Sequence, residues 1–194
     1  ASGLPGAEEA HRLRWVDCSK PSDEMRYLNG FAHTDGRFHF APDWAALGPD
    51  YAIMPPLPDH MNNIDKATDE HPYRLVTAPA RRFLNSTFTE TPTSRRKEGR
   101  PTALVHPDDC RDLGLEDGDR VRIGNARATV VVHVRPFAGL QSGVVVVEGI
   151  WPNKAFEGGL GINALTSADP APPAGGAVFH DTAVWLGAEK GRGR

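Results

Sequence analysis

The sequence predicts a mainly β domain, a small barrel of six short strands with one or two short helices, preceded by an irregular extended arm. The first observation is the abundance of turn-forming residues. The 20 glycines and 17 prolines among 194 residues disfavour a helical bundle and favour short strands joined by turns. The second observation is that short apolar runs, several of them alternating with polar residues, recur regularly after about residue 71. Residues before that point show no comparable series.

Residues 1–70 are expected to form an arm that packs against another part of a larger protein. A short helix is expected over 7–17, a strand over 37–40, and an extended run over 54–58, where three prolines disfavour a helix. The first residue is Ala and not Met, which agrees with a piece of a longer chain. The expected division is therefore an arm at 1–70, a barrel at 71–188 and a tail at 189–194.

Six strands are expected in the barrel segment, each bounded by proline, glycine or a polar turn. In chain order they cover 74–77, 102–106, 120–124, 127–134, 144–148 and 183–186. The valine run at 144–148 is continuous, which is typical of a strand buried on both faces. Between the second and third strands, Pro107 opens a short helix, acidic residues follow it, and Gly114 ends it.

Composition and charge exclude several classes of protein. A net charge of −3 and a pI near 6.2 argue against a general nucleic-acid binder. No apolar run approaches the roughly 20 residues of a membrane-spanning helix. Cys18 and Cys110 lie far apart and indicate neither a disulfide framework nor a zinc knuckle. Because no signal-peptide pattern opens the sequence, the expected location is the cytoplasm.

No catalytic or metal-binding set is predicted. His106 and Cys110 lie in a strand, helix and turn segment whose polar residues are explained by helix capping and turn formation. His180 and Asp181 are neighbours in an expected strand, so their side chains would point to opposite faces and form no dyad. The charge run at 95–97 is expected to be a solvated turn.

Two segments carry groups suited to a phosphorylated or planar ligand. Residues 77–89 follow a strand and bring hydroxyls, an amide and two arginines to a point where backbone N–H groups are free, as a phosphate-bearing ligand requires. A polar surface loop is the alternative. Residues 148–167 are rich in glycine, which lets a backbone approach a ligand closely. Trp151 is suited to stacking on a planar ring, and Asn163 and Thr166 to hydrogen bonding.

The order of these motifs resembles a known family. The motifs are Leu75-Val76-Thr77, the polar segment Phe83-Leu84-Asn85-Ser86-Thr87, Val105-His106-Pro107-Asp108-Asp109, the segment 113–121, the valine run and Asn163-Ala164-Leu165-Thr166. In this order they resemble the C-terminal cofactor domain of the molybdopterin oxidoreductases related to dimethyl sulfoxide reductase and formate dehydrogenase. The resemblance covers about 29–188 and is weaker before residue 71.

This resemblance implies a six-stranded double-psi β-barrel that helps to hold bis(molybdopterin guanine dinucleotide) with molybdenum or tungsten. It assigns pterin and pyrophosphate contacts to Thr77, Ala78, Arg81, Asn85, Ser86, Thr87, Trp151, Asn153, Asn163, Leu165 and Thr166. Ala78-Pro79 stands where the family often has Gly-Arg, so Arg81 or Arg82 is expected to supply the positive charge. The family's metal ligand and iron–sulfur cysteines belong to upstream domains. The chain is thus expected to be a non-catalytic portion of a molybdenum oxidoreductase, with the rest of that enzyme as its partner.

Two other functions use small barrels of this kind. One is a stand-alone double-psi barrel that binds protein partners, as in the N-terminal domains of some AAA-type ATPases. The aromatic arm and the Trp151 segment argue mildly against it. The other is the self-processing aspartate decarboxylase type, which requires cleavage at a Gly-Ser bond, and the sequence contains no Gly-Ser pair. Nucleic-acid binding has only the arginines near residues 81 and 95 in its favour and is not expected.

Overall fold

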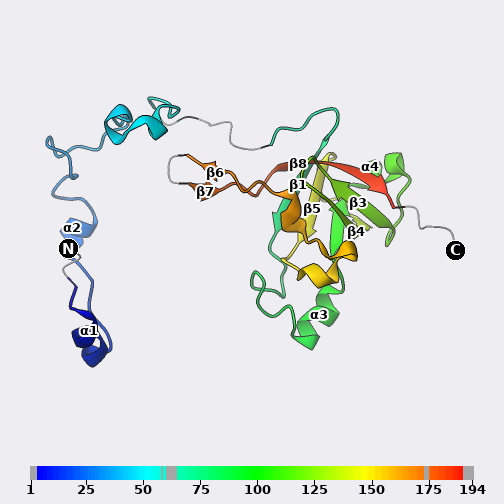
Figure 1. The fold of residues 1–194 in the computed structure, drawn as a ribbon, viewed down its shortest axis with the longest axis horizontal. Coiled ribbons are helices and arrows are strands. Elements are labelled where there is room, and N and C mark those ends of the chain that lie inside the picture. Colours follow the sequence, from blue (N-terminus) through cyan, green and yellow to red (C-terminus); the bar gives the residue numbers. More distant parts are fainter. Residues whose placement is uncertain (1–3, 58, 60–64, 173–174, 190–194) are drawn as a thin grey trace. The chain divides into compact units, whose positions relative to one another are not determined.

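The structure, a computed structural model, describes residues 4–57, 59, 65–172 and 175–189 (Figure 1). Contacts between residues divide the chain into two units, Ala1–Asp59 and His60–Arg194. The division falls between residues 59 and 60, whereas the sequence pattern changes near residue 71. Across the described residues, no helix has the length and apolar character needed to cross a membrane.

The first unit consists of short helical turns with little buried surface. It contains the helices α1 (Ala7–Leu13) and α2 (Ser22–Met25) and the 3-10 turns η1 (Ala45–Leu47) and η2 (Pro49–Tyr51). None of its residues whose exposure is described is buried. The unit therefore lacks a hydrophobic core of its own in the part that the structure describes.

Two expectations for this unit differ from the structure. The helix begins at Ala7 as expected but ends at Leu13, because Arg14 adopts a left-handed backbone conformation with φ +63°. The expected strand over 37–40 is irregular. A strand needs a neighbour to satisfy its backbone N–H and C=O groups, and the described part of this unit contains no other strand.

Four aromatic side chains of the first unit contact one another in succession. Tyr27 stacks on Phe31 with ring centroids 4.9 Å apart, Phe31 meets Phe38 at 5.3 Å, and Phe38 meets Phe40 at 4.9 Å. We call these four residues the aromatic row. All four are exposed, so the row presents a continuous apolar surface within this unit.

Six strands of the second unit close into a barrel, as the sequence predicts. They are β1 (Tyr73–Ala78), β2 (Thr102–Val105), β3 (Arg120–Gly124), β4 (Thr129–Pro136), β5 (Val144–Glu148) and β8 (Thr182–Ala188). Around the barrel their order is β1-β5-β2-β4-β3-β8. The pairs β1–β5 and β2–β4 are parallel, and the other four pairs are antiparallel.

The pairing pattern repeats between the two halves of the barrel. The strands β1, β2 and β3 of the first half correspond to β4, β5 and β8 of the second. Under this correspondence the parallel pair β1–β5 matches the parallel pair β4–β2, and the antiparallel pair β3–β4 matches the antiparallel pair β8–β1. Two interlocked halves, each contributing one strand to each of the two parallel pairs, make a double-psi β-barrel. The expected fold class is confirmed, although the sequence itself shows no repeat.

The hydrophobic core lies inside the barrel and comes from alternate strand residues. On β4 three alternate valines are buried, and on β5 Val145 and Val147 are fully buried. Val144 and Val146 are only half-buried. The expectation that this valine strand is buried on both faces is therefore wrong, because successive side chains of a barrel strand alternate between the interior and the outer surface.

The helix after β2 forms as its sequence predicts. It is α4 (Pro107–Leu113), and the His106 ring Nδ1 accepts a hydrogen bond from the Asp108 backbone N–H at 3.2 Å, which caps its first turn. Gly114 follows with φ +66° and ends the helix in the left-handed conformation. His106 thus has a capping role.

Other short elements are not indicated by the sequence pattern. Between β1 and β2 the chain forms α3 (Pro92–Glu98), so the charge run at 95–97 lies in a helix and not in the expected solvated turn. After β5 come the 3-10 turns η3 (Asn153–Ala155), η4 (Glu157–Gly159) and η5 (Ile162–Leu165). A two-stranded ribbon, β6 (Pro170–Ala171) and β7 (Gly176–Ala177), precedes β8.

A buried carboxylate ties α4 to the turn before β5. Asp109 is 7% exposed. It accepts hydrogen bonds from the Ser142 hydroxyl at 2.6 Å and from the Gly143 backbone N–H at 2.8 Å. Both carboxylate oxygens therefore have a donor, which offsets the cost of burying the group.

Candidate functional site

A cleft of about 270 Å³ opens at one end of the barrel, and three segments distant in the sequence line it. The first segment comprises the last residues of β1 and those that follow it, the second runs from the end of β5 to η5, and the third immediately precedes β8. The lining residues are Thr77, Ala78, Pro79, Ala80, Asn85, Gly149, Ile150, Ile162, Asn163, Phe179 and His180. The two segments in which the sequence predicts binding residues therefore converge on one cleft.

Parallel pairing of β1 and β5 brings the first two segments together. The register pairs Ala78 with Glu148, so both strands end at the same edge of the barrel. One residue later, the Gly149 N–H donates to the Ala78 carbonyl at 2.7 Å. The walls of the cleft thus continue directly from two hydrogen-bonded strands.

Gly149 is required for this close approach. Its φ is +83°, a conformation that side chains disfavour. A Cβ added there would lie 2.9 Å from the Ala80 Cβ and 3.2 Å from Phe83 Cδ2. Only a residue without a side chain lets the segment after β5 lie against the segment after β1.

The first segment holds Asn85 at the tip of a tight turn. Leu84 and Thr87 exchange backbone hydrogen bonds of 3.1 and 2.8 Å across it, and Asn85 has a left-handed φ of +51°. Ser86 and Thr87 lie on the same turn but are exposed and outside the lining. Arg81 is also exposed and outside the lining.

The second segment brings Asn163 to the cleft on η5. Thr166 closes this turn, because its N–H and its hydroxyl both donate to the Asn163 carbonyl, at 3.2 and 3.0 Å. Leu165 is fully buried in the core. Neither Leu165 nor Thr166 is among the lining residues, and both hold η5 in place.

Trp151 and Asn153 lie away from the lining. Trp151 is 7% exposed, and its ring meets that of Phe83 edge-to-face with centroids 4.9 Å apart. The indole belongs to the core beneath the cleft, a packing that does not fit the expected stacking on a planar ligand. Asn153 is exposed on η3, with its side-chain oxygen against Gly161.

The third wall is a feature that the sequence interpretation missed. Phe179 and His180 contact each other with ring centroids 4.4 Å apart, and both line the cleft. The Thr77 hydroxyl donates to the Phe179 carbonyl at 3.5 Å. The sequence feature that could have indicated this wall is the aromatic pair directly before the last expected strand. That strand pairs with β1 beside the cleft.

An ion pair fixes this third wall to β1. Asp181 has a left-handed φ of +62° and lies in a bend before β8, so the expected strand geometry for the pair His180 and Asp181 is wrong. Its carboxylate accepts two hydrogen bonds from the Arg74 guanidinium. This contact raises the pKa of Arg74.

Most of the lining is apolar, and its few polar groups carry no permanent charge. Among the described lining residues there is no Lys, Arg, Asp or Glu, and the polar groups are amides, one hydroxyl, one imidazole and the backbone. The described residues contain no group of three or more His, Cys, Asp or Glu side chains placed to hold a metal ion. The cleft is therefore suited to recognition by hydrogen bonds and close backbone contact.

Comparison with known proteins identifies the domain that contains this cleft. Residues 73–183 match the family described as "Molydopterin dinucleotide binding domain". The chain is 32% identical over 118 residues to the probable oxidoreductase YoaE of Bacillus subtilis, which covers 61% of this chain and 17% of the relative. It is 27% identical over 144 residues to dimethyl sulfoxide reductase DmsA of Escherichia coli, covering 70% of this chain and 18% of the relative.

A solved structure gives the same fold. Acetylene hydratase from Pelobacter acetylenicus superposes with a TM-score of 0.65 at 18% identity, covering 82% of this chain and 24% of that one. The chain spans less than a fifth of the length of the curated relatives named here.

Proposed function

The chain belongs to the molybdopterin dinucleotide-binding domain family, and on that premise we propose that its cleft holds part of a molybdopterin guanine dinucleotide through pterin and pyrophosphate contacts. The observation that carries this proposal is the convergence of the segments after β1 and β5 on one cleft. Thr77, Asn85 and Asn163 are the side chains we assign to these contacts.

The residues present fit such a ligand. Two side-chain amides supply donors, the Thr77 hydroxyl becomes a third when its long bond to the Phe179 carbonyl is exchanged for one to the ligand, and Gly149 lets backbone approach the ligand where a Cβ would fill the space. Hydrogen bonds to phosphate oxygens are charge-assisted and therefore stronger than neutral ones. Phosphate charge is met in this proposal by amide and hydroxyl groups, with the exposed Arg81 and Arg82 contributing long-range attraction from the same segment.

The size of the cleft limits how much of the cofactor this chain holds. Pockets that enclose a drug-sized ligand have volumes of about 300–1,000 Å³, and this one is about 270 Å³. We therefore assign it one portion of one dinucleotide and expect the remainder to lie against other parts of the enzyme. When bound, the cofactor supplies two-electron redox chemistry at molybdenum or tungsten, and this chain's residues bind and orient it.

We further propose that the chain is the C-terminal portion of a longer oxidoreductase. Curated relatives named above are more than five times the matched length. The aromatic row of the first unit supports this proposal, because contiguous exposed apolar surface marks an interaction site. Its proposed partner is the catalytic body of the same enzyme.

The test is cofactor retention in the full-length enzyme carrying Asn85→Ala, Asn163→Ala or both. Each charge-assisted hydrogen bond is worth about 1.5–3 kcal/mol, so each loss weakens binding by about 10- to 150-fold. Metal per polypeptide is measured by mass spectrometry, and acid hydrolysis releases the nucleotide for chromatography. We expect GMP from the wild type and lower contents of metal and GMP in both variants.

The matched control is Gln141→Ala, which removes an exposed amide in the turn before β5, outside the lining. It is expected to retain wild-type metal and nucleotide. Unchanged contents in both asparagine variants would refute the assignment of the cleft. Release of CMP in place of GMP would refute the guanine form and leave the cleft assignment intact.

A further inference from the structure

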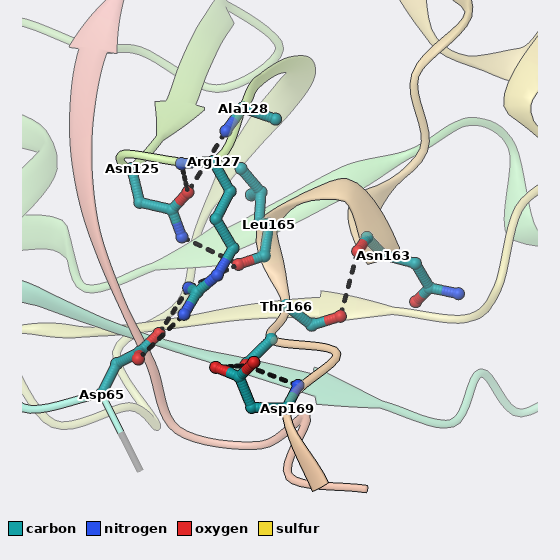
Figure 2. Close-up of polar contacts among 9 residues, drawn as sticks. Asp65, Asn125, Arg127, Ala128, Asn163, Leu165, Thr166 and Asp169 are labelled. Carbon is teal, nitrogen blue, oxygen red and sulfur yellow. Dashed lines mark hydrogen bonds and ion pairs between the residues drawn. The ribbon is translucent and has the colours of Figure 1, made fainter.

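Two side chains from the turn between β3 and β4 hold the backbone of η5 through one atom. The Leu165 carbonyl accepts a hydrogen bond from Asn125 Nδ2 at 2.8 Å and another from Arg127 Nη1 at 3.3 Å (Figure 2). Figure 2 shows both groups meeting this carbonyl from the same side. We call Asn125, Arg127 and the carboxylate that pairs with Arg127, Asp65, the Leu165 clasp.

Asp65 fixes the guanidinium of the clasp. Arg127 Nη1 and Nη2 donate to the two Asp65 carboxylate oxygens at 2.7 and 3.2 Å. The hydrogen bonds that Arg127 donates to Asp65 raise the pKa of the guanidinium. With both terminal nitrogens engaged by the carboxylate, the planar group has a fixed orientation toward the Leu165 carbonyl.

The turn fixes the Asn125 amide in the same way. Its side-chain oxygen accepts from the backbone N–H groups of Arg127 and Ala128, at 2.9 and 3.4 Å, and its backbone N–H donates to the Ala128 carbonyl at 3.0 Å. The amide oxygen is thus committed to the turn. Its NH₂ group is left to face η5.

The position of η5 depends on hydrogen-bond partners outside the turn itself. A 3-10 turn of four residues has few internal hydrogen bonds, and its last carbonyls have no partner within it. Ile162 and Leu165 anchor it from the core side, and the clasp engages it at its last carbonyl. Asn163, between these anchors, lines the cleft.

We propose that Asn125, Arg127 and Asp65 are positioning residues that set η5 so that Asn163 meets the dinucleotide. This inference rests on the proposed function of the cleft. Through the Arg127 guanidinium, the clasp also links Asp65, which lies in the segment before β1, to the binding site. None of the three residues lines the cleft itself.

A double-mutant cycle in the full-length enzyme separates positioning from general stabilisation. The variants are Arg127→Ala, Asn163→Ala and the double variant, and the measurement is metal and nucleotide retained after dialysis. Arg127→Ala is expected to weaken retention by about 2- to 13-fold, the range of one net hydrogen bond. In the Asn163→Ala background it is expected to have no further effect, because the clasp acts through Asn163.

Two further variants identify which contact matters. The exchange of Asp65→Arg with Arg127→Asp restores an ion pair but leaves no donor at position 127 for the Leu165 carbonyl, so retention is expected to stay low. Asp65→Asn keeps Arg127 and removes the carboxylate that orients it. This variant is expected to lose less cofactor than Arg127→Ala. The latter variant also keeps the test open if Arg127→Ala does not fold.

Arg111→Ala is the control, because Arg111 makes an ion pair with Asp108 at 2.8 Å on α4, more exposed than the Arg127–Asp65 pair and outside the cleft lining. Hydrogen exchange of the Ala164 and Thr166 amides adds a readout that needs no cofactor. Faster exchange at both amides in Arg127→Ala, and not in Arg111→Ala, is expected.

The outcomes distinguish the two levels of the argument. If Asn85→Ala and Asn163→Ala both retain cofactor like the wild type, the proposed function of the cleft fails. If only Asn163→Ala does so, the clasp proposal fails, because the clasp acts through Asn163. If Asn163→Ala loses cofactor while Arg127→Ala behaves like Arg111→Ala, the clasp proposal fails and the proposed function stands. Additive losses in the double variant also overturn the clasp proposal, since they indicate independent effects.

Discussion

Gly149→Ala is the substitution whose effect follows most directly from the geometry of the cleft. The added Cβ would lie 2.9 Å from the Ala80 Cβ and 3.2 Å from Phe83 Cδ2. The φ of +83° adds a conformational cost. Because Ala80 lines the cleft and Phe83 lies in the core, neither neighbour can yield without displacing the segment after β1.

The magnitude is the sum of two terms. A left-handed backbone costs a residue with a side chain about 1–2 kcal/mol, and overpacking a tightly packed site costs about 1–3 kcal/mol. Gly149→Ala is therefore expected to lower the free energy of unfolding by about 2–5 kcal/mol. Gly143→Ala is the matched control, because Gly143 has φ +84° but no atom within 4 Å of the added Cβ, and it is expected to cost only the first term.

Thermal unfolding of the two variants isolates the steric term. At roughly 2–4 °C per kcal/mol for a chain of this size, Gly149→Ala is expected to melt about 2–12 °C below Gly143→Ala. It is also expected to lose cofactor in the full-length enzyme, whereas Gly143→Ala retains it. Equal melting temperatures, or full cofactor retention by Gly149→Ala, would show that the two segments need no such close approach.

Three other predictions concern buried groups of the barrel. Asp109→Ala leaves two donors unpaired and is expected to lower the free energy of unfolding by about 1–3 kcal/mol in urea titrations. An unchanged free energy of unfolding would contradict the role of Asp109 in tying α4 to the turn before β5. Burial is the main cause that lowers the pKa of His133, and the positive charge of the nearby Arg100 lowers it further. As the pH falls, His133 is therefore protonated in the unfolded state before it is protonated in the folded state. The free energy of unfolding is expected to decline as the pH falls below about 6.5. His133→Gln is expected to flatten this decline between pH 7.5 and 5.5, and an unchanged slope would exclude His133 as its source. Burial raises the pKa of the Cys110 thiol, so iodoacetamide is expected to modify the exposed Cys18 in the native protein and Cys110 only after unfolding.

The strands were predictable because their alternation is local. The strand β3 covers the predicted residues 120–124, since apolar and polar residues alternate there between an acidic turn and a glycine. The helix α4 was equally local, with Pro107 at its start and Gly114 after its end. In these segments each residue's preference agrees with its final environment.

The helix α3 shows what composition conceals. Three consecutive basic residues suggest a solvated turn, yet a proline at the first helical position and good helix formers after it make a short helix. The pairing symmetry of the barrel is hidden for a different reason. The symmetry lies in which strands pair with one another. Backbone groups make these pairs, so the two halves can share a pairing pattern without sharing side chains.

For the site, the sequence predicted the segments better than the side chains. The order of the motifs identified the two segments that converge on the cleft. Of the residues predicted in them, Thr77, Ala78, Asn85 and Asn163 line the cleft. Apolar members of the same segments, Leu165 among them, are instead buried beneath it. A glycine-rich segment near a ligand still needs anchors in the core, and a single sequence does not separate anchors from contacts.

Closure of the barrel has a consequence for how the protein is made. The strand β1 pairs on one side with β8, and Arg74 faces Ala183 across that pair. During synthesis β1 lacks this neighbour until the residues of β8 have left the ribosome, and contacts of such long sequence separation form slowly. Phe179 and His180 are also translated late, so the third wall of the cleft is assembled last. Under the proposed function, cofactor insertion into this cleft is therefore expected to follow translation of the whole barrel, when β1 is paired on both sides.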